Sequence, residues 1–261
     1  MSLVLGASLS GCNVILGIHD LPGQQDDGGV DAAPGSVDAN DSDGSAPPTC
    51  VTPPSDIIAW WDGDSLGGDI VGSFSNPMEI GNPTLAMGIV GEAIQFGAGD
   101  LLSYDPAPMS TSGDFTLEGW VFLDHTHTNY YSIYGRYFET AVCTYNTRLV
   151  LWDSDLGGAG VGNLVTSDTE LNQRWSHIAV TWDGSQSYLY INGVVEDSAQ
   201  TGQPITLPSR AQVGGLINPN NGDLVDRFEG IIDELTLYER ALGANEIQAI
   251  YNASTAGKCK P

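Results

Sequence analysis

The side chains of this 261-residue chain that are able to do chemistry include four cysteines, four histidines and 33 acidic residues. The cysteines stand at positions 12, 50, 143 and 259, and none lies at the spacing from another cysteine or a histidine that is typical of a zinc site. His125 and His127 form an i, i+2 pair in a polar segment, where we expect both side chains to be solvated. The four glycines within residues 157–162 are not followed by Lys-Ser or Lys-Thr, and no helix is predicted after them. The sequence therefore points away from zinc and nucleotide chemistry.

The charge balance excludes two further classes of partner. The chain has 33 acidic and 8 basic residues, for a formal net charge of −25. Phosphate backbones and anionic lipid surfaces would repel such a chain, so we expect no nucleic-acid binding and no electrostatic docking on a membrane. The same excess of acids suits a soluble exported protein, and it also suits cation binding.

The first twelve residues resemble the signal peptide of a bacterial lipoprotein. Leu3-Val4-Leu5-Gly6-Ala7 is an apolar run, and Leu9-Ser10-Gly11-Cys12 matches the lipobox, in which an aliphatic and two small residues precede the lipidated cysteine. The run is shorter than the roughly 20 apolar residues of a transmembrane helix. The resemblance implies lipidation of Cys12, with a chance cysteine in an apolar N-terminus as the alternative.

Two details refine the lipoprotein hypothesis. No Lys or Arg occurs before Arg136, so the basic segment of a signal peptide is missing, and we expect the true start to lie upstream of Met1. Asn13 follows the cysteine, where an Asp would resemble an inner-membrane retention signal. We therefore expect an exported protein, anchored through lipid alone to the outer membrane or cell surface.

Residues 13–55 are predicted to form a disordered acidic linker. From Pro22 to about Pro54 the chain consists largely of Gly, Asp, Ala, Ser and Pro, without an aromatic residue. Such a composition buries too little apolar surface to offset the entropy of ordering. A coil of some 30 residues has an r.m.s. span of roughly 30 Å.

The segment from Trp175 to Leu242 has a clear strand pattern. Ile178, Val180 and Trp182 share one face of an extended chain, because side chains alternate with period two. Asn192-Gly193 is a tight-turn dipeptide between two apolar runs, which predicts a hairpin. At the end of the chain, an apolar stripe at i, i+3 and i+4 predicts one short helix within residues 242–251.

Several segments, which follow one another in the same order as in the family, resemble the laminin-G-like jelly roll of the concanavalin A-like lectin/glucanase superfamily. The matching segments are Ile57–Trp61 followed by Asp-Gly, Gly88–Phe96, Phe115–Phe122, Trp175–Trp182, and Gly230–Leu242 with its terminal Arg-Ala-Leu. The resemblance implies an all-β fold over residues 56–255, a two-sheet antiparallel jelly-roll sandwich with a short C-terminal helix. One sandwich hosts many unrelated sites, so the resemblance indicates the fold more firmly than the function.

The jelly-roll resemblance implies a disulfide. Cys50 precedes the first predicted strand and Cys259 follows the predicted helix. The first and last strands of a jelly roll commonly lie side by side, so we expect these two cysteines to form a bond. Cys143 lies within a predicted strand, where a buried free thiol is the simplest interpretation.

Related domains often hold a structural Ca²⁺ near the sheet edge, with acidic ligands after the first strand and in the Gly-x-Ile-Asp-Glu segment. The corresponding positions are Asp62, Asp64 and Asp233. Ca²⁺ prefers six to eight hard oxygen ligands, so loop carbonyls would complete the set. The alternative is that Asp62 and Asp64 cap a turn.

Aromatic and polar side chains are the candidates for ligand binding. Loops carry recognition on rigid sandwiches, which favours residues 124–131 with His125, Tyr130 and Tyr131, and we add Trp120 as a ring that could stack on a sugar. Most large aromatic residues of a sandwich are core residues, which is the alternative for each Trp.

Glucanases on this fold carry Glu-x-Asp-x-x-Glu on one strand, because retaining hydrolysis needs two carboxyl groups about 5 Å apart. This sequence lacks that string, and Asp233 to Glu239 has a different spacing. We therefore predict a non-catalytic, lipid-anchored module that binds carbohydrate. Protein–protein adhesion through a surface protein is the alternative, and a glycoside hydrolase with an unrecognised site is a third hypothesis.

Overall fold

The computed structural model describes residues 49–72, 76–107, 113–153, 163–201, 204–208 and 210–261. All of them belong to the unit Ala46–Pro261. The predicted signal peptide, Cys12, most of the predicted linker and the glycine-rich residues 157–162 lie outside the described residues. Within the described part, no helix has the length and apolar character needed to cross a membrane.

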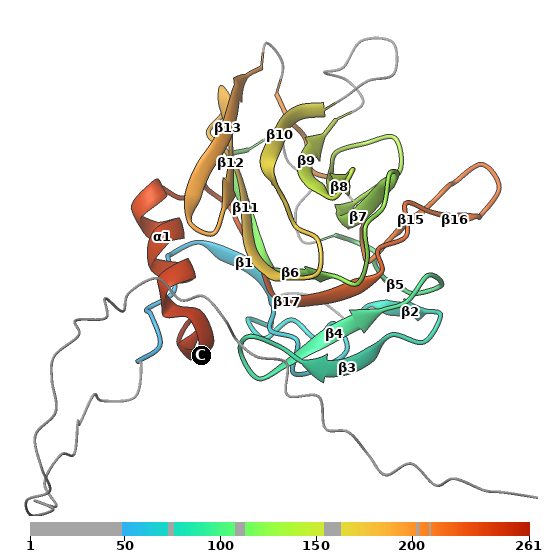
Figure 1. The fold of residues 1–261 in the computed structure, drawn as a ribbon, viewed down its shortest axis with the longest axis horizontal. Coiled ribbons are helices and arrows are strands. Elements are labelled where there is room, and N and C mark those ends of the chain that lie inside the picture. The colour runs from blue at the N-terminus through green and yellow to red at the C-terminus, as the bar shows by residue number, and fades with distance from the viewer. Residues whose placement is uncertain (1–48, 73–75, 108–112, 154–162, 202–203, 209) are drawn as a thin grey trace, which may run out of the picture. The chain divides into compact units, whose positions relative to one another are not determined.

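Eight antiparallel strands form the first sheet, in the order β13-β12-β11-β6-β17-β4-β3, with β1 also paired to β17 (Figure 1). Their bounds are β1 Ile57–Trp61, β3 Thr84–Met87, β4 Glu92–Phe96, β6 Phe115–Leu123, β11 Trp175–Trp182, β12 Gln186–Ile191, β13 Val194–Gln200 and β17 Gly230–Tyr238. The central strand β17 pairs with β4 along Gly230–Ile232 and with β1 along Leu235–Tyr238. Strands β1 and β4 therefore follow one another along β17, and the junction between them lies beside Asp233 and Glu234.

Seven antiparallel strands form the second sheet, in the order β10-β9-β8-β7-β14-β5-β2. Their bounds are β2 Met78–Ile80, β5 Leu101–Tyr104, β7 Tyr130–Gly135, β8 Ala141–Tyr145, β9 Arg148–Trp152, β10 Asn163–Glu170 and β14 Ala211–Val213. A separate hairpin, β15 Leu216–Ile217 with β16 Leu224–Val225, extends from this side of the domain (Figure 1).

The core lies between the two sheets and follows the period-two pattern of the sequence. In β6, Phe115, Leu117 and Val121 are fully buried and belong to the central cluster, while Thr116 and Glu118 point to the opposite face of the sheet. The corresponding inward residues of the second sheet complete the cluster. The predicted two-sheet antiparallel jelly-roll sandwich is thus confirmed.

The predicted helix is present as α1, Ala244–Ala253, followed by a 3₁₀ turn, η1 Ser254–Ala256. Its apolar stripe buries Ile247 and Ile250 against the outer face of the first sheet, where Tyr190 and Tyr238 belong to the same cluster. The residues that follow, 257–261, are called the C-terminal tail below. Helix and tail together cover part of the outer face of the eight-stranded sheet.

The start of β4 differs from the sequence prediction. The predicted strand at Gly88–Phe96 begins only at Glu92, because Gly88 and Gly91 close a turn with Gly91 at φ 70°.

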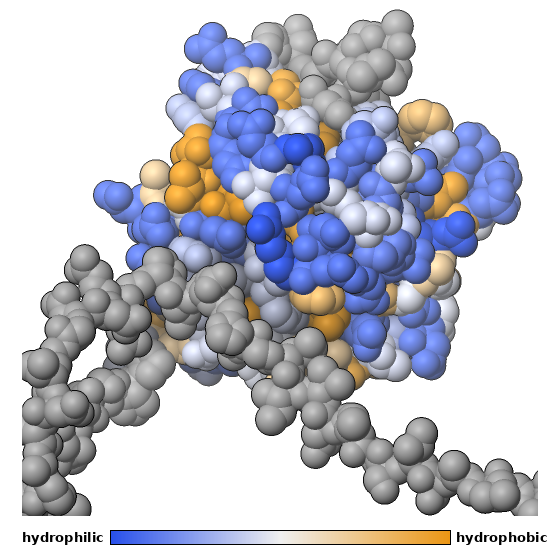
Figure 2. Space-filling view, in the orientation of Figure 1, coloured by the Kyte–Doolittle hydropathy of each residue, from blue (hydrophilic) through white to orange (hydrophobic). Residues whose placement is uncertain are grey.

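Hydrophobic side chains gather over β13 on an otherwise largely hydrophilic face (Figure 2), and Val194 and Val195 of this strand are exposed.

Candidate functional site

Strands β7, β8 and β9 present aromatic side chains on the outer face of the seven-stranded sheet. Leu151 of β9 points into the core, so its neighbour Trp152 points away from it. The strand register places Trp152 opposite Ala141 and Tyr130 opposite Tyr145 on this outer face. The rings of Tyr130 and Tyr145 stack with their centroids 4.6 Å apart.

A cleft lies over these strands and reaches the β15–β16 hairpin. It contains about 600 Å³ of space that no atom fills, part of it open to solvent. The lining residues of this aromatic cleft are Tyr130, Tyr137, Phe138, Ala141, Cys143, Trp152, Leu216 and Asp226. Phe138 is 61% exposed, and Tyr130, Tyr137 and Trp152 are half-buried. The cleft therefore offers several ring faces to a ligand.

A polar hollow adjoins the aromatic cleft and shares Tyr130 and Asp226 with it. Its lining residues are Thr128, Asn129, Tyr130, Tyr131, Tyr145, Leu224, Val225, Asp226, Arg227 and Glu229. This arrangement brings carboxylate, guanidinium and amide groups next to the aromatic rings. Ring faces beside a few polar groups are the usual composition of a small-molecule site.

The loop that was predicted to bind ligand borders this hollow. Nε2 of His125 lies 3.2 Å from the Tyr131 hydroxyl, which donates to Glu229 at 3.5 Å. The His127 ring stacks on Tyr131 with a centroid distance of 3.7 Å and hydrogen-bonds to Thr144. The expectation of a solvated His127 is wrong, because these contacts leave its side chain only 8% exposed, and burial lowers its pKa. Of the predicted residues, Tyr130 lines both the aromatic cleft and the polar hollow, Tyr131 lines the polar hollow, and His125 contacts Tyr131.

Asp226 is the acidic residue that both hollows share. It follows β16 in a left-handed conformation with φ 46°, which aspartate tolerates better than most residues. Its backbone carbonyl accepts a hydrogen bond from Ser132 of β7 at 2.7 Å, which ties the hairpin to the sheet. Burial raises the pKa of the Asp226 carboxyl, and this carboxyl in turn helps to raise the pKa of the buried Cys143 thiol. Asp226 is therefore an acceptor held in a partly desolvated position.

The outer face of the eight-stranded sheet contains a second cluster of polar groups, which is buried. Glu118 of β6 is fully buried and contacts Lys258 Nζ at 2.7 Å, His177 Nε2 at 3.0 Å and the Tyr238 hydroxyl at 3.2 Å. Burial raises the pKa of Glu118, but Lys258 and His177 outweigh this effect and lower it to about 2. Lys258 also lies over the Trp60 ring, 4.9 Å from its centroid. The cluster is a closed charge network beneath the tail.

The three predicted calcium ligands lie at the junction of β1, β4 and β17. Lys260 of the tail places Nζ 2.8 Å from Asp62 Oδ2 and 2.5 Å from Asp64 Oδ2. Asp233 instead accepts the backbone N–H groups of Ile89 and Val90 at 2.7 and 2.9 Å through Oδ2. In the part of the chain that the structure describes, no three His, Cys, Asp or Glu side chains converge in a way that could hold a metal ion. The arrangement with Lys260 in place does not fit Ca²⁺.

Asp233 is unusual even without a metal ion. Burial raises its pKa to about 7, although the two backbone N–H groups act in the opposite direction. Gly88 allows this approach, since a Cβ there would lie 2.5 Å from Asp233 Oδ2. The other carboxylate oxygen, Oδ1, is buried without a hydrogen-bond partner among the described residues.

Trp120 does not lie in the aromatic cleft. It belongs to β6 in the eight-stranded sheet, and it is 7% exposed. Its ring contacts His177 and Tyr251 at centroid distances of 5.2 and 5.7 Å. Trp120 therefore lies away from the aromatic cleft, because α1 packs over this face of β6, and its predicted role in sugar stacking stays a prediction.

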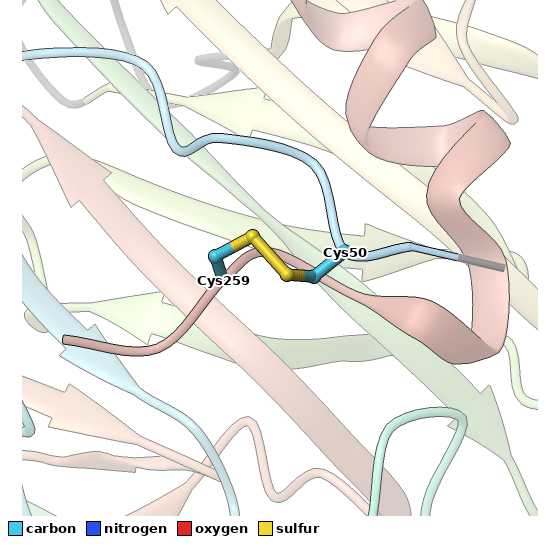
Figure 3. The surroundings of a disulfide bond; sticks show 2 residues. All are labelled: Cys50 and Cys259. Carbon is cyan, nitrogen blue, oxygen red and sulfur yellow. A yellow bond between two sulfur atoms is a disulfide. The ribbon is translucent and has the colours of Figure 1, made fainter. Parts of the chain in front are cut away.

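The predicted disulfide is confirmed. Cys50 and Cys259 are bonded, with their Cα atoms 4.9 Å apart, and the bond joins the segment before β1 to the tail (Figure 3). Cys143 is a buried free cysteine, as expected, and it also lines the aromatic cleft. Cys12, the predicted lipidation site, lies outside the described residues.

Sequence reasoning missed two parts of these sites. It did not predict the β15–β16 hairpin, which supplies Leu216 and leads to Asp226. It also overlooked that the only two lysines of the chain, Lys258 and Lys260, flank Cys259. This second signal was visible, because two cations beside a predicted disulfide in a strongly acidic chain indicate specific acidic partners.

A family model described as "Concanavalin A-like lectin/glucanases superfamily" matches residues 96–248, more than half of the chain. No curated protein sequence matches this chain.

Several solved structures have a similar fold. Domain 4 of AbnA, a GH43 extracellular arabinanase from Geobacillus stearothermophilus in complex with arabinotriose, has a TM-score of 0.62 and 20% identity, covering 76% of this chain and 98% of that chain. The binding domain of botulinum neurotoxin DC in complex with rat synaptotagmin II has a TM-score of 0.62 and 13% identity, covering 76% and 52%. Botulinum neurotoxin type C, whose cell entry depends on interaction with two ganglioside molecules, has a TM-score of 0.60 and 13% identity, covering 76% and 51%. This chain spans about half the length of these toxin chains, and at such identities the likeness concerns the fold alone.

Proposed function

This chain belongs to the concanavalin A-like lectin/glucanases superfamily, and we propose that it binds carbohydrate in the aromatic cleft as a non-catalytic module. The observation that carries the proposal is the group of partly exposed rings that line the aromatic cleft: Tyr130 of β7, Tyr137 and Phe138 between β7 and β8, and Trp152 of β9. The apolar face of a sugar ring packs on such side chains, and its hydroxyl groups need hydrogen-bonding partners nearby. Asp226, in the wall of the cleft, is one such partner.

The polar hollow supports an elongated ligand. It continues from the aromatic cleft through Tyr130 and Asp226, and it adds Asn129, Arg227 and Glu229. The two hollows together provide room for more than one sugar unit, so an oligosaccharide fits better than a monosaccharide. The arabinanase domain with arabinotriose and the ganglioside-dependent toxin belong to the same fold and support a saccharide ligand.

Anchoring through lipid on Cys12 is the second part of the proposal. Its support is the lipobox sequence Leu9-Ser10-Gly11-Cys12 alone. A tethered module at the outer membrane or cell surface compensates for weak single-site affinity through avidity, because many copies share one surface. Expression of the gene with its upstream codons, followed by labelling with a palmitate analogue, tests this part. We expect Cys12→Ala to abolish labelling, and unchanged labelling would refute it.

Binding is tested with the full chain on a glycan array, followed by isothermal titration of the best oligosaccharide. Trp152→Ala is expected to weaken binding about five- to tenfold, since one stacked ring contributes about 1–1.5 kcal/mol. Trp175→Ala is the matched control, because Trp175 is also a half-buried strand residue but lies on β11 beside Phe122. Equal affinities of the two variants would place the site elsewhere.

Absence of catalysis is a separate expectation. The purified chain should release no reducing sugar from the polysaccharide that it binds. Clear release that disappears in Asp226→Asn or Glu229→Gln would instead identify a hydrolase, because these two acids lie in the hollows.

A protein partner is the second candidate function. The exposed Val194 and Val195 of β13 are the observation that favours it, and Figure 2 shows hydrophobic side chains gathered over this strand. If the glycan array gives no signal, a partner captured by the wild type but lost with Val194→Ser and Val195→Ser would support adhesion over sugar binding.

A further inference from the structure

Asp226 is the one charged side chain among the described residues that line the aromatic cleft. The Cys143 thiol beside it stays neutral, because burial and the Asp226 carboxyl raise its pKa. The other lining residues are aromatic or aliphatic: Tyr130, Tyr137, Phe138, Trp152, Ala141 and Leu216. The cleft therefore combines several aromatic rings with a single negative charge.

Among the described residues, no cation pairs with Asp226. All eight lysines and arginines of the chain lie in the described part, and the ion pairs that they form are with other acids. Arg227, the next residue along, is exposed and lines the adjoining polar hollow. Burial raises the pKa of the Asp226 carboxyl, and no hydrogen bond or cation among the described residues acts against this effect. A half-buried carboxylate in this state is stabilised by a cation that approaches it.

The aromatic rings of the cleft favour the same sign of ligand charge. The face of an aromatic ring carries negative charge density and attracts an ammonium group within about 6 Å of its centroid. Phe138 is exposed and contacts Tyr137, with 4.2 Å between the ring centroids, while Tyr130 and Trp152 are half-buried. The carboxylate and the rings therefore both attract a cation and both repel an anion.

The buried charge network on the other sheet shows how a ring and a carboxylate together hold an ammonium group. Lys258 Nζ lies 2.7 Å from Glu118 Oε1 and 4.9 Å from the centroid of the Trp60 ring. The carboxylate and the ring come from different parts of the chain there, as do Asp226 and Trp152 in the aromatic cleft. Because no cation of the chain pairs with Asp226, the ammonium group in the cleft has to come from a ligand.

We propose that the aromatic cleft selects an amino sugar, whose ring packs on the aromatic side chains and whose ammonium group pairs with Asp226. This inference rests on the proposed function, since it names the class of saccharide that the same site binds. A hydroxyl group of a neutral sugar donates a hydrogen bond to Asp226 but leaves its charge unpaired. An acidic sugar is repelled by the cleft and by a chain with a net charge of −25, which attracts a cationic saccharide instead.

The polar hollow extends the same preference to a second sugar unit. It adds Glu229, which accepts the Tyr131 hydroxyl at 3.5 Å. Asp226 lines both hollows, and Arg227 is the single cation of the described residues that line them. The carboxylates of the two hollows thus outnumber the guanidinium, so an oligomer of amino sugars is attracted along both.

The test is isothermal titration of the full chain with two oligosaccharides of equal length in a weakly acidic buffer. One is a glucosamine oligomer with free ammonium groups, and the other is its neutral N-acetylated form. We expect the wild type to bind the ammonium form about tenfold more tightly, since a carboxylate and a ring act on the same cation. Added salt should reduce this preference, because it screens the charges.

Two variants decide whether Asp226 causes the preference. Asp226→Asn should bind both oligomers with equal affinity. Asp223→Asn is the matched control, because it removes one negative charge from the same hairpin but lines neither hollow, and it should keep the preference. Equal affinities of the wild type for the two oligomers, or a preference that survives in Asp226→Asn, overturn the inference. If Asp226→Asn does not fold, millimolar choline should displace the glucosamine oligomer from the wild type, and a lack of displacement overturns the inference.

The same titrations separate this inference from the proposed function. Binding of the N-acetylated oligomer that weakens in Trp152→Ala, without a preference for the ammonium form, leaves sugar binding in place and refutes the amino sugar. If neither oligomer binds, the proposed function and this inference are both refuted. Choline binding that Asp226→Asn abolishes would then assign the cleft to an ammonium ligand without a sugar ring.

Discussion

The outer face of the eight-stranded sheet is closed, whereas the outer face of the seven-stranded sheet is open. On the first, Glu118 and Thr236 are fully buried, and Lys258 of the tail pairs with both. On the second, Tyr130 and Trp152 are half-buried. In the described part of the chain, the one α-helix packs on the other sheet and does not cover them. The closed face uses its charges for stability, and the open face leaves its polar groups for a ligand.

The disulfide is the feature of the closed face with the largest expected effect. Cys259→Ser opens a loop whose ends are 209 residues apart. In the chain-entropy model this costs about 5 kcal/mol of the free energy of unfolding, which denaturation in urea measures. Because the bond lies far from the cleft in the fold, we expect the remaining folded protein to bind sugar with unchanged affinity. Cys50→Ser should have the same effect, and the double variant should cost nothing more; additive losses would contradict the pairing.

Glu118 tests the closed charge network directly. Glu118→Gln leaves Lys258 buried without its nearest carboxylate, which should lower the free energy of unfolding by about 3 kcal/mol. The pH dependence gives a second readout. The pKa of Glu118 is lowered to about 2 in the folded state, so its contribution is present above its ordinary pKa of 4.5 and is lost as the pH falls toward 2. The Gln variant should lack that part of the acid destabilisation, and an unchanged acid profile would count against the network.

Much of the fold was predictable because alternation is a local signal. The alternation of Ile178, Val180 and Trp182 predicted one face of β11, and all three side chains lie in the core. The apolar stripe near Ile247 predicted the helix to within two residues. The disulfide followed from the fold resemblance. By contrast, the two-residue strands of the β15–β16 hairpin are too short to show any period.

The candidate site was predictable only in part, because its residues come from different strands that strand pairing brings together. Tyr130 and Tyr131 were found because they lie in one polar segment. Their partner Tyr145 comes from β8, and Trp152 comes from β9, which only the pairing of strands reveals. Trp120 shows a different difficulty: the sequence offers its ring as a candidate for sugar stacking but does not reveal that Tyr251 of the helix packs against it.

Asp233 should give the closed face a pH dependence of opposite sign to that of Glu118. Its pKa is raised to about 7, so between its ordinary value of 3.8 and 7 the folded state holds a proton that the unfolded state has lost. Stability contributed by this group therefore falls as the pH rises through that window. Between pH 5.5 and 8 the wild type should lose about 2 kcal/mol more than Asp233→Asn, measured by urea denaturation. Parallel pH profiles of the two proteins would show that Asp233 is ionised throughout the window.

Ionised Glu118 stabilises the fold, whereas ionised Asp226 on the open face should destabilise it. Burial raises its pKa, so ionised Asp226 is unfavourable in the folded state, and stability falls as the pH rises through this raised value. Asp226→Asn should raise the free energy of unfolding at pH 7 by a few tenths of a kcal/mol, since asparagine also tolerates the left-handed backbone. The same variant should bind sugar more weakly, because a neutral amide replaces a carboxylate acceptor. Higher stability with lower affinity is the signature of a group kept for binding. A variant that is both less stable and unchanged in affinity would place Asp226 with the structural charges of the closed face.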